Sequence, residues 1–281
     1  FGTLYPLFAE AVTGAKLSVG PPYFNLVAGP LALILGALVA VGPLLSWRRQ
    51  TRPVLRRLTI PALAAMTVLV TTIILTPAMP QLPRLGLTVA GGLAVASILP
   101  LTVRNPLRAP LTLWGMVVAH FGIAVALTGM TADSAFTRET LAAARPGETL
   151  AVGPWLVRLN GLTPTAGPNW TAIEADLRAS RGGGIVTLRP QSRYFTDPPT
   201  ETNEAAIATL FGGQLYTVLG KPDGAGRWQL RLWWKPFVTL IWLGGALIAL
   251  GGALALAGRA WRSLRKRRAP RTVDDWRRRG A

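Results

Sequence analysis

The residue types best suited to chemistry are scarce in this sequence, which contains one histidine, His120, and no cysteine. Without a thiol, the chain has no disulfide framework, no cysteine nucleophile and no cysteine-ligated zinc or iron–sulfur centre. A single histidine excludes a metal site built from several histidines of this chain alone, and any histidine-dependent triad would have to use His120. The sequence assigns no catalytic residue, and His120 is the one candidate ligand for a metal ion.

His120 is the only ionisable residue in the apolar stretch 110–130, and it stands near the middle of that stretch. A stretch of this length can cross a bilayer, and an ionisable side chain at its centre is usually functional. A neutral imidazole at that depth suits an axial ligand of haem iron, whose second histidine would have to come from outside this chain. The alternatives are a proton relay, which needs an Asp or Glu at similar depth and finds none here, and a histidine that only bonds a neighbouring helix.

The small residues of the same stretch predict how this helix packs. They recur at spacings of three and four, which places them within about 80° of one another and permits close contact with another helix. The set is Gly115, Ala119, Gly122, Ala126 and Gly129. His120 lies about 140° from Gly115 around a helix, so we expect it to face away from this contact.

Five apolar stretches are long enough to cross a membrane, which needs about 20 residues each. Half of the 281 residues are hydrophobic and 15% are charged, against about a quarter charged in a typical soluble protein. One soluble core cannot hide five such stretches, so the sequence predicts a mainly α integral membrane protein. The predicted spans are residues 26–47, 58–79, 85–103, 110–130 and 237–258.

The basic residues predict the orientation of these spans. Of the 30 Lys and Arg, 17 lie in three segments that share one side of the membrane if the chain crosses five times. The segments are residues 48–57, residues 104–108 and a tail, residues 259–281. Because basic residues concentrate in cytoplasmic segments, the tail is predicted to be cytoplasmic and residues 1–25 and 131–236 periplasmic. The net charge of +18 thus reflects topology and some attraction to the lipid bilayer, and we predict no nucleic-acid partner.

Residues 131–236, between the fourth and fifth spans, are predicted to form a small extramembrane β domain. The segment is nearly neutral and too long for a plain connection. Residues 172–178 and 228–233 alternate polar and apolar side chains, as half-buried strands do. We therefore predict a sandwich or barrel of about six or seven strands.

Turn signals and aromatic residues refine this domain. Arg181–Gly184 predicts a hairpin turn, residues 161–168 predict a loop, and residues 203–210 predict a short helix. Trp233 and Trp234 stand just before the fifth span, where the aromatic belt of a membrane protein is expected. Trp228 is then expected in the domain core; a ligand-binding role for the tryptophans is the alternative.

Nine motifs, in the same order along the chain, together form a recognisable pattern. They are Gly2–Pro6, Ser18–Asn25, Ala119–Gly122, Gly167–Ala172, Leu188–Phe195, Thr202–Ile207, Leu215–Gly220, Lys235–Phe237 and Ile241–Gly244. The pattern covers nearly the whole chain and resembles the C-terminal half of the CcmF family, the haem lyase subunits of bacterial cytochrome c maturation. A nitrite-reductase-associated paralogue of the same family is the nearest alternative.

The resemblance implies a multi-pass protein of the bacterial inner membrane that attaches haem covalently to apocytochrome c on the periplasmic side. It implies that a CcmE-type chaperone delivers haem as substrate and that a CcmH-type subunit handles the apocytochrome. It further implies a resident haem b held by two transmembrane histidines, one of which matches His120. This haem is expected to reduce the delivered haem, with quinol as a possible source of electrons.

Several family features are missing from this sequence. The Trp-rich haem-handling segment, its flanking histidines and the second transmembrane histidine belong to the family's N-terminal half. We therefore expect the chain to be part of a lyase that needs this missing half and is inactive alone. The alternative is a non-catalytic scaffold or docking subunit whose β domain recruits maturation partners. A permease is disfavoured because the sequence shows no repeated pair of broken helices.

Gly20–Pro22 predicts a stiff, non-helical segment that leads into the first span.

Overall fold

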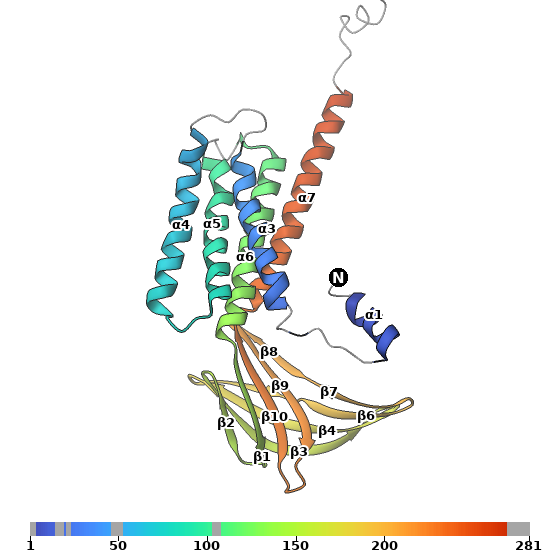
Figure 1. The fold of residues 1–281 in the computed structure, drawn as a ribbon. Helices are drawn as coiled ribbons and strands as arrows, with labels where there is room; N and C mark the ends of the chain where they lie inside the picture. Colours follow the sequence, from blue (N-terminus) through green and yellow to red (C-terminus); the bar gives the residue numbers. More distant parts are fainter. Residues whose placement is uncertain (1–3, 15–19, 21–23, 46–52, 103–107, 269–281) are drawn as a thin grey trace, which may run out of the picture. The chain divides into compact units, whose positions relative to one another are not determined.

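A computed structural model describes residues 4–14, 20, 24–45, 53–102 and 108–268 of the chain. These residues form two compact units. The helical unit contains the chain up to Thr128 and from Leu243 onward, and the β unit contains Gly129–Trp242. Figure 1 shows that the strands are inserted in the chain between the helices α6 and α7.

Five helical stretches in the described part of the chain are long and apolar enough to cross a membrane, which confirms the predicted fold class. The helices are α1 (Leu4–Thr13), the π-helix η1 (Phe24–Ala28), α3 (Gly29–Val41), the 3-10 helix η2 (Gly42–Leu44), α4 (Pro53–Leu75), α5 (Gln81–Thr102), α6 (Leu111–Phe136) and α7 (Thr239–Arg268). The first membrane stretch joins η1, α3 and η2, whereas α1 lies in the segment that was predicted to be periplasmic. Most of the predicted Gly20–Pro22 lead falls outside the described residues.

The turn between α4 and α5 differs from the predicted span boundaries. Helix α4 ends at Leu75 and α5 begins at Gln81, so the second span is shorter than predicted and the third begins earlier. Thr76 precedes Pro77, and a residue before proline disfavours the helical conformation. Arg84 Nη2 donates to the carbonyl oxygens of Thr76 and Pro77, both 3.1 Å away, and so satisfies acceptors at the end of α4.

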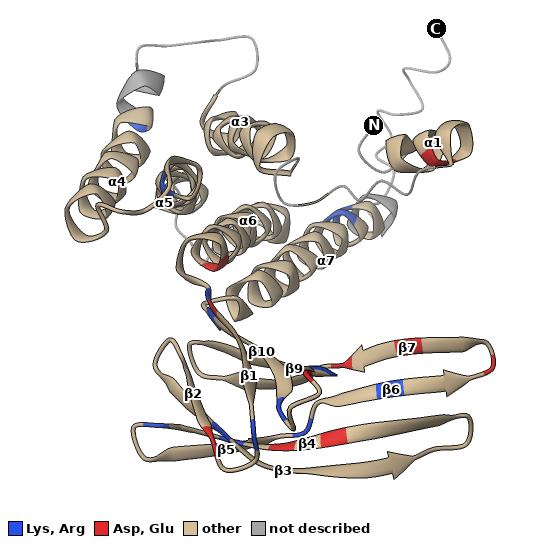
Figure 2. Cartoon of the chain, turned by 60° about the horizontal axis from the view of Figure 1, so that its bottom comes forward, with Lys and Arg blue, Asp and Glu red and all other residues tan. Residues whose placement is uncertain are grey.

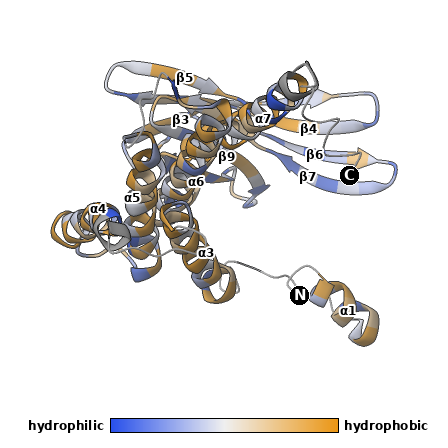
Figure 3. Cartoon of the chain, turned by 90° about the horizontal axis from the view of Figure 1, so that it is seen from above, coloured by the Kyte–Doolittle hydropathy of each residue, from blue (hydrophilic) through white to orange (hydrophobic). Residues whose placement is uncertain are grey.

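The long helices expose apolar side chains in a way that requires lipid to cover them. In each of the stretches Phe24–Leu44 and Arg57–Leu75, 6% of the most apolar 18-residue segment is buried within the protein. Figure 3 shows hydrophobic residues all along these helices, and Figure 2 shows charged residues to be sparse on the helices and frequent on the strands. The chain is therefore a multi-pass membrane protein.

The β unit is described without gaps and contains ten antiparallel strands in two sheets. The four-stranded sheet has the order β1-β10-β9-β8, and the six-stranded sheet has the order β2-β3-β4-β6-β7, with β5 also paired to β4. The strands are β1 (Arg138–Ala144), β2 (Thr149–Val152), β3 (Trp155–Ala166), β4 (Trp170–Arg181), β5 (Gly184–Leu188), β6 (Gln191–Thr196), β7 (Pro199–Glu204), β8 (Ala206–Leu210), β9 (Gly213–Pro222) and β10 (Trp228–Pro236).

The core of the β unit lies between the two sheets. Its fully buried leucines alternate with exposed residues along the strands, as in Leu230 and Leu232 of β10. The predicted sandwich is confirmed, but its strands outnumber the six or seven predicted. One reason is that the long strand β4 pairs with β6 over its first half and with β5 over its second half, so one strand supports two partners.

Two local predictions in the β unit were wrong. Strands β7 and β8 replace the helix predicted over residues 203–210, because their backbone groups pair with β6 and β9. Tertiary pairing of this kind overrides local propensity. Gly161 and Pro164 lie within β3, so the predicted loop shrinks to residues 167–169. The turn predicted at Arg181–Gly184 is confirmed, and its two central glycines have positive φ.

The tryptophans near the fifth span divide between two roles. Trp234 is 6% exposed and belongs to the core, where its ring centroid lies 5.9 Å from that of Trp155. Its assignment to a membrane belt was therefore wrong. Trp233, on the opposite face of β10, is half-buried and packs edge-on against Tyr216. Trp228 packs against the core, as predicted.

Candidate functional site

His120 lies in α6 and is half-buried. Its Nδ1 atom is 2.8 Å from the carbonyl oxygen of Met116, one helical turn earlier. Because a carbonyl oxygen only accepts hydrogen bonds, this contact places the imidazole proton on Nδ1 and leaves the lone pair on Nε2. Among the residues that the structure describes, no group of three or more His, Asp or Glu side chains is placed to hold a metal ion. His120 thus stands as a single nitrogen donor within a membrane helix.

The small-residue face of α6 packs against α7 at very short range. A methyl group added at Gly115 would lie 2.5 Å from the backbone nitrogen of Ala255, and one added at Gly122 would lie 2.8 Å from the carbonyl oxygen of Gly244. The predicted close helix contact is confirmed. His120 lies about 140° to 160° around the helix from these two glycines, so it faces away from α7.

A cavity of about 400 Å³ opens in the helical unit beside the His120 face of α6. Its lining residues come from η2, α4, α5 and α6: Pro43, Leu44, Arg57, Leu99, Pro100, Leu113 and Met116. Leu113, Met116 and His120 follow one another at spacings of three and four, which places them on one stripe of the helix. The cavity therefore begins one turn of α6 away from His120.

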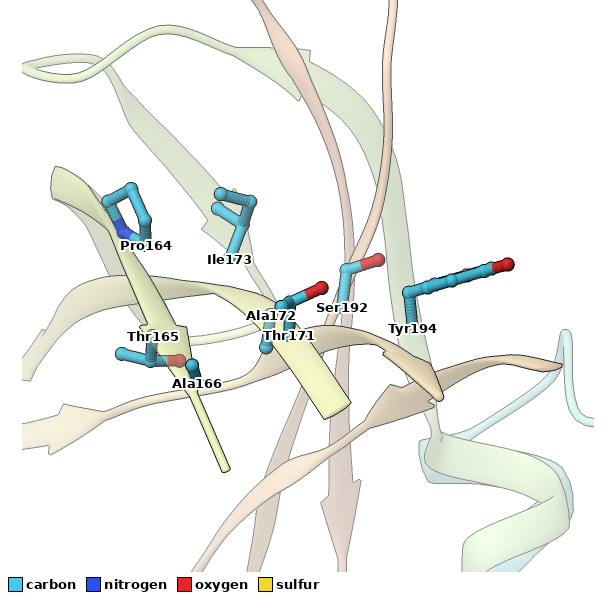
Figure 4. A pocket seen from close by; sticks show the side chains of 8 residues that line it. All are labelled: Pro164, Thr165, Ala166, Thr171, Ala172, Ile173, Ser192 and Tyr194. Atoms are coloured by element: carbon cyan, nitrogen blue, oxygen red, sulfur yellow. The ribbon is translucent and has the colours of Figure 1, made fainter. Parts of the chain in front are cut away.

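The β unit has a second hollow, an open groove of about 470 Å³ on the strands β3, β4 and β6 (Figure 4). Its lining residues are Pro164, Thr165, Ala166, Thr171, Ala172, Ile173, Ser192 and Tyr194. Most of these side chains are small, and the larger Tyr194 remains 45% exposed. Such a groove fits an apolar side chain or an extended peptide better than an ion.

Three of the motifs that carry the family resemblance meet beside this groove. Residues 167–172, 188–195 and 202–207 lie on or next to the neighbouring strands β4, β6 and β7. The guanidinium carbon of Arg193 lies 4.3 Å from the ring centroid of Trp170, so two of these motifs are joined by a cation–π contact. Sequence order alone did not indicate this convergence.

Comparison with known proteins identifies relatives of both the β unit and the whole chain. The family model described as the CcmF C-terminal beta-sandwich matches residues 135–236, which contain all ten strands of the β unit. The chain is 36% identical over 280 residues to the cytochrome c-type biogenesis protein CcmF of Pseudomonas aeruginosa, a match that covers 93% of the chain. The chain belongs to the CcmF family. CcmF of Escherichia coli is 31% identical over 91% of the chain.

A solved CcmF structure has the same fold as this chain. The structure named Cytochrome c Heme Lyase CcmF superposes with a TM-score of 0.72 and 25% identity over 91% of the chain. The cytochrome c-type biogenesis protein NrfE of Haemophilus influenzae is 27% identical over 92% of the chain. The chain spans about two fifths of the length of its CcmF relatives, 41% for the Pseudomonas protein and 42% for the solved chain.

The structure adds residues that sequence reasoning missed. Arg57 was interpreted only as an orientation signal, yet this exposed residue lines the cavity beside the His120 stripe. Met116 was assigned no role, yet its carbonyl fixes the His120 proton. The spacing of Leu113, Met116 and His120 was a usable signal for a shared face, whereas no sequence signal placed Arg57 beside it.

Proposed function

We propose that the chain forms the C-terminal part of a haem lyase that attaches haem to apocytochrome c at the periplasmic side of the bacterial inner membrane. The reaction would need the N-terminal half of the subunit, a CcmE-type haem chaperone and a CcmH-type subunit that handles the apocytochrome. Family membership and the printed name of the solved relative support this proposal. The chain contains no thiol, so the thiols that receive the haem lie outside it, and we assign them to the apocytochrome.

His120 is proposed as one axial ligand of a resident haem b. The observation that carries this assignment is the hydrogen bond from Nδ1 to the carbonyl oxygen of Met116. This bond holds the ring and leaves the lone pair of Nε2 available to coordinate iron within a membrane helix. Haem iron is commonly held by a neutral histidine nitrogen oriented in this way, so the residue fits the group. A bound haem b would supply one-electron chemistry, with quinol as a proposed source of electrons. The second axial histidine would lie outside this chain.

Replacement of His120 tests this assignment. In the lyase purified from membranes, His120→Ala is expected to remove most of the b-type Soret absorption and the bound haem, because one axial bond is lost. Thr128→Ala in the same helix removes another side-chain bond to a carbonyl one turn earlier and serves as the control. Unchanged haem content and an unchanged Soret band in His120→Ala would exclude His120 as a ligand.

A second function, docking of maturation partners by the β unit, is favoured by the groove beside Tyr194. In this role His120 would only pack, and the chain would act as a scaffold. A photo-crosslinking residue at Tyr194 in the full-length protein is expected to capture the apocytochrome or the haem chaperone. Capture that persists in His120→Ala, together with unchanged haem, would favour the scaffold role over the lyase role.

A further inference from the structure

The cavity beside α6 combines an apolar wall with a single cation. Six of its seven lining residues are apolar, and the seventh is Arg57 at the beginning of the second membrane stretch. Two of the apolar residues are prolines, Pro43 in η2 and Pro100 in α5. Among the described residues, Arg57 has no hydrogen-bond or ion-pair partner, unlike Arg84, whose side chain donates to two carbonyls. The guanidinium of Arg57 is therefore available to an anion in the cavity.

The cavity is lined by two residues of α6, Leu113 and Met116, that share one stripe of the helix with His120. Met116 lines it and lies four residues before His120, which is about 6 Å along the helix axis. Leu113 lines it one turn further in the same direction. A molecule bound at His120 Nε2 and extending along this face toward Arg57 would therefore need an apolar body and an anionic edge.

Resting on the proposed haem b at His120, we propose that Arg57 is the counter-ion of a haem propionate and that the cavity receives the propionate-bearing edge of the macrocycle. Haem b has a large apolar ring with two carboxylates on one edge, which matches an apolar wall that ends at a guanidinium. Arginine binds carboxylates through two parallel hydrogen bonds, and its charge is retained in weakly polar surroundings. The phosphate of an anionic lipid is also negatively charged, but a lipid bound to Arg57 would not need to reach His120.

The test compares haem b with haem dimethyl ester, in which the propionates are neutral. The haem-depleted lyase in detergent is loaded with either molecule, and the release of each into excess apomyoglobin is followed by optical absorption. The unsubstituted protein is expected to retain haem b roughly ten-fold longer than the ester, because only haem b makes the charged contact. Arg57→Gln is expected to abolish this preference, and Arg57→Lys is expected to restore part of it.

Controls separate this inference from the proposed function. Arg108→Gln removes an exposed cation that does not line the cavity and is expected to keep the preference for haem b. Equal retention of haem and ester by the unsubstituted protein, or an unchanged preference in Arg57→Gln, would overturn the Arg57 assignment and leave the His120 assignment intact. Loss of co-purified phosphatidylglycerol from Arg57→Gln with an unchanged haem preference would assign the cavity to lipid instead. Failure of the proposed function is recognised separately, by haem retention in His120→Ala.

Discussion

Trp233 and Trp234 are adjacent in sequence but have different surroundings in the β unit. Trp234 shares the buried face of β10 with Leu230 and Leu232, and the guanidinium carbon of Arg181 lies 5.3 Å from its ring centroid. Trp233 points to the other face, where the guanidinium of Arg231 lies 4.6 Å from its ring centroid. The alternation of apolar even-numbered residues with other residues along this strand was visible in the sequence. The proximity of Trp234 to the fifth span nevertheless suggested that it belongs to a membrane belt. The two-residue period of the strand decided the position of each ring.

Alanine substitution should separate these two tryptophans. Trp234→Ala is expected to lower the free energy of unfolding of the β unit by about 3–5 kcal/mol, because it empties a buried aromatic site. Trp233→Ala is expected to cost about 1–2 kcal/mol, since that ring keeps only an edge contact and a cation–π contact. Pulse proteolysis of the full chain in urea measures both values. Equal losses for the two variants would contradict the assignment of Trp234 to the core.

At the level of elements, the contact between α6 and α7 depends on glycines of both helices. Gly251 of α7 lies against the backbone of α6 near Gly115, whereas the neighbouring Gly252 has open space around its Cβ position. The two glycines are adjacent in sequence but face different surroundings, because a helix turns about 100° per residue. In lipid, close backbone packing of this kind is a main source of helix association. The contact fixes the rotation of α6 and therefore the direction of His120.

This pair provides a matched test of the helix contact. Gly251→Ala is expected to force α6 and α7 apart and to lower stability by about 1–3 kcal/mol, as overpacking does. Gly252→Ala is expected to be neutral or to stabilise α7 by up to about 1 kcal/mol, because alanine is the better helix former. The thermal unfolding midpoint in detergent measures both effects. If Gly251→Ala were as stable as Gly252→Ala, the close contact would not exist.

At the level of the whole molecule, the five apolar stretches and the distribution of cations predict a single orientation. Described cations near the ends of α6 and α7, such as Arg108 and Arg262, belong to segments that were predicted to be cytoplasmic. The β unit carries charges of both signs (Figure 2) and is predicted to be periplasmic. Because these 281 residues contain no cysteine, a cysteine introduced here is a unique label within the chain.

Cysteine labelling tests this orientation directly. Thr163→Cys in β3 and Ser263→Cys in α7 both replace exposed side chains and remove no charge. A membrane-impermeant maleimide is expected to label Thr163→Cys in intact spheroplasts and to label Ser263→Cys only after permeabilisation. The reverse pattern would invert the proposed topology, and labelling of both variants in sealed cells would contradict an odd number of crossings between them.

The sequence by itself determined the number of membrane stretches, the presence of a β sandwich, the family and the candidate role of His120. These features depend on local properties, namely runs of apolar residues, two-residue alternation, collinear motifs and a single ionisable residue in an apolar stretch. Only the tertiary structure decided that β7 and β8 replace a helix and that Arg57 lines a cavity beside the His120 stripe. Both depend on contacts between segments distant in sequence, whose energies no local pattern records. The orientation of His120 depends on both levels. The spacing of the glycines predicted it, and the packing of α7 against those glycines fixed it.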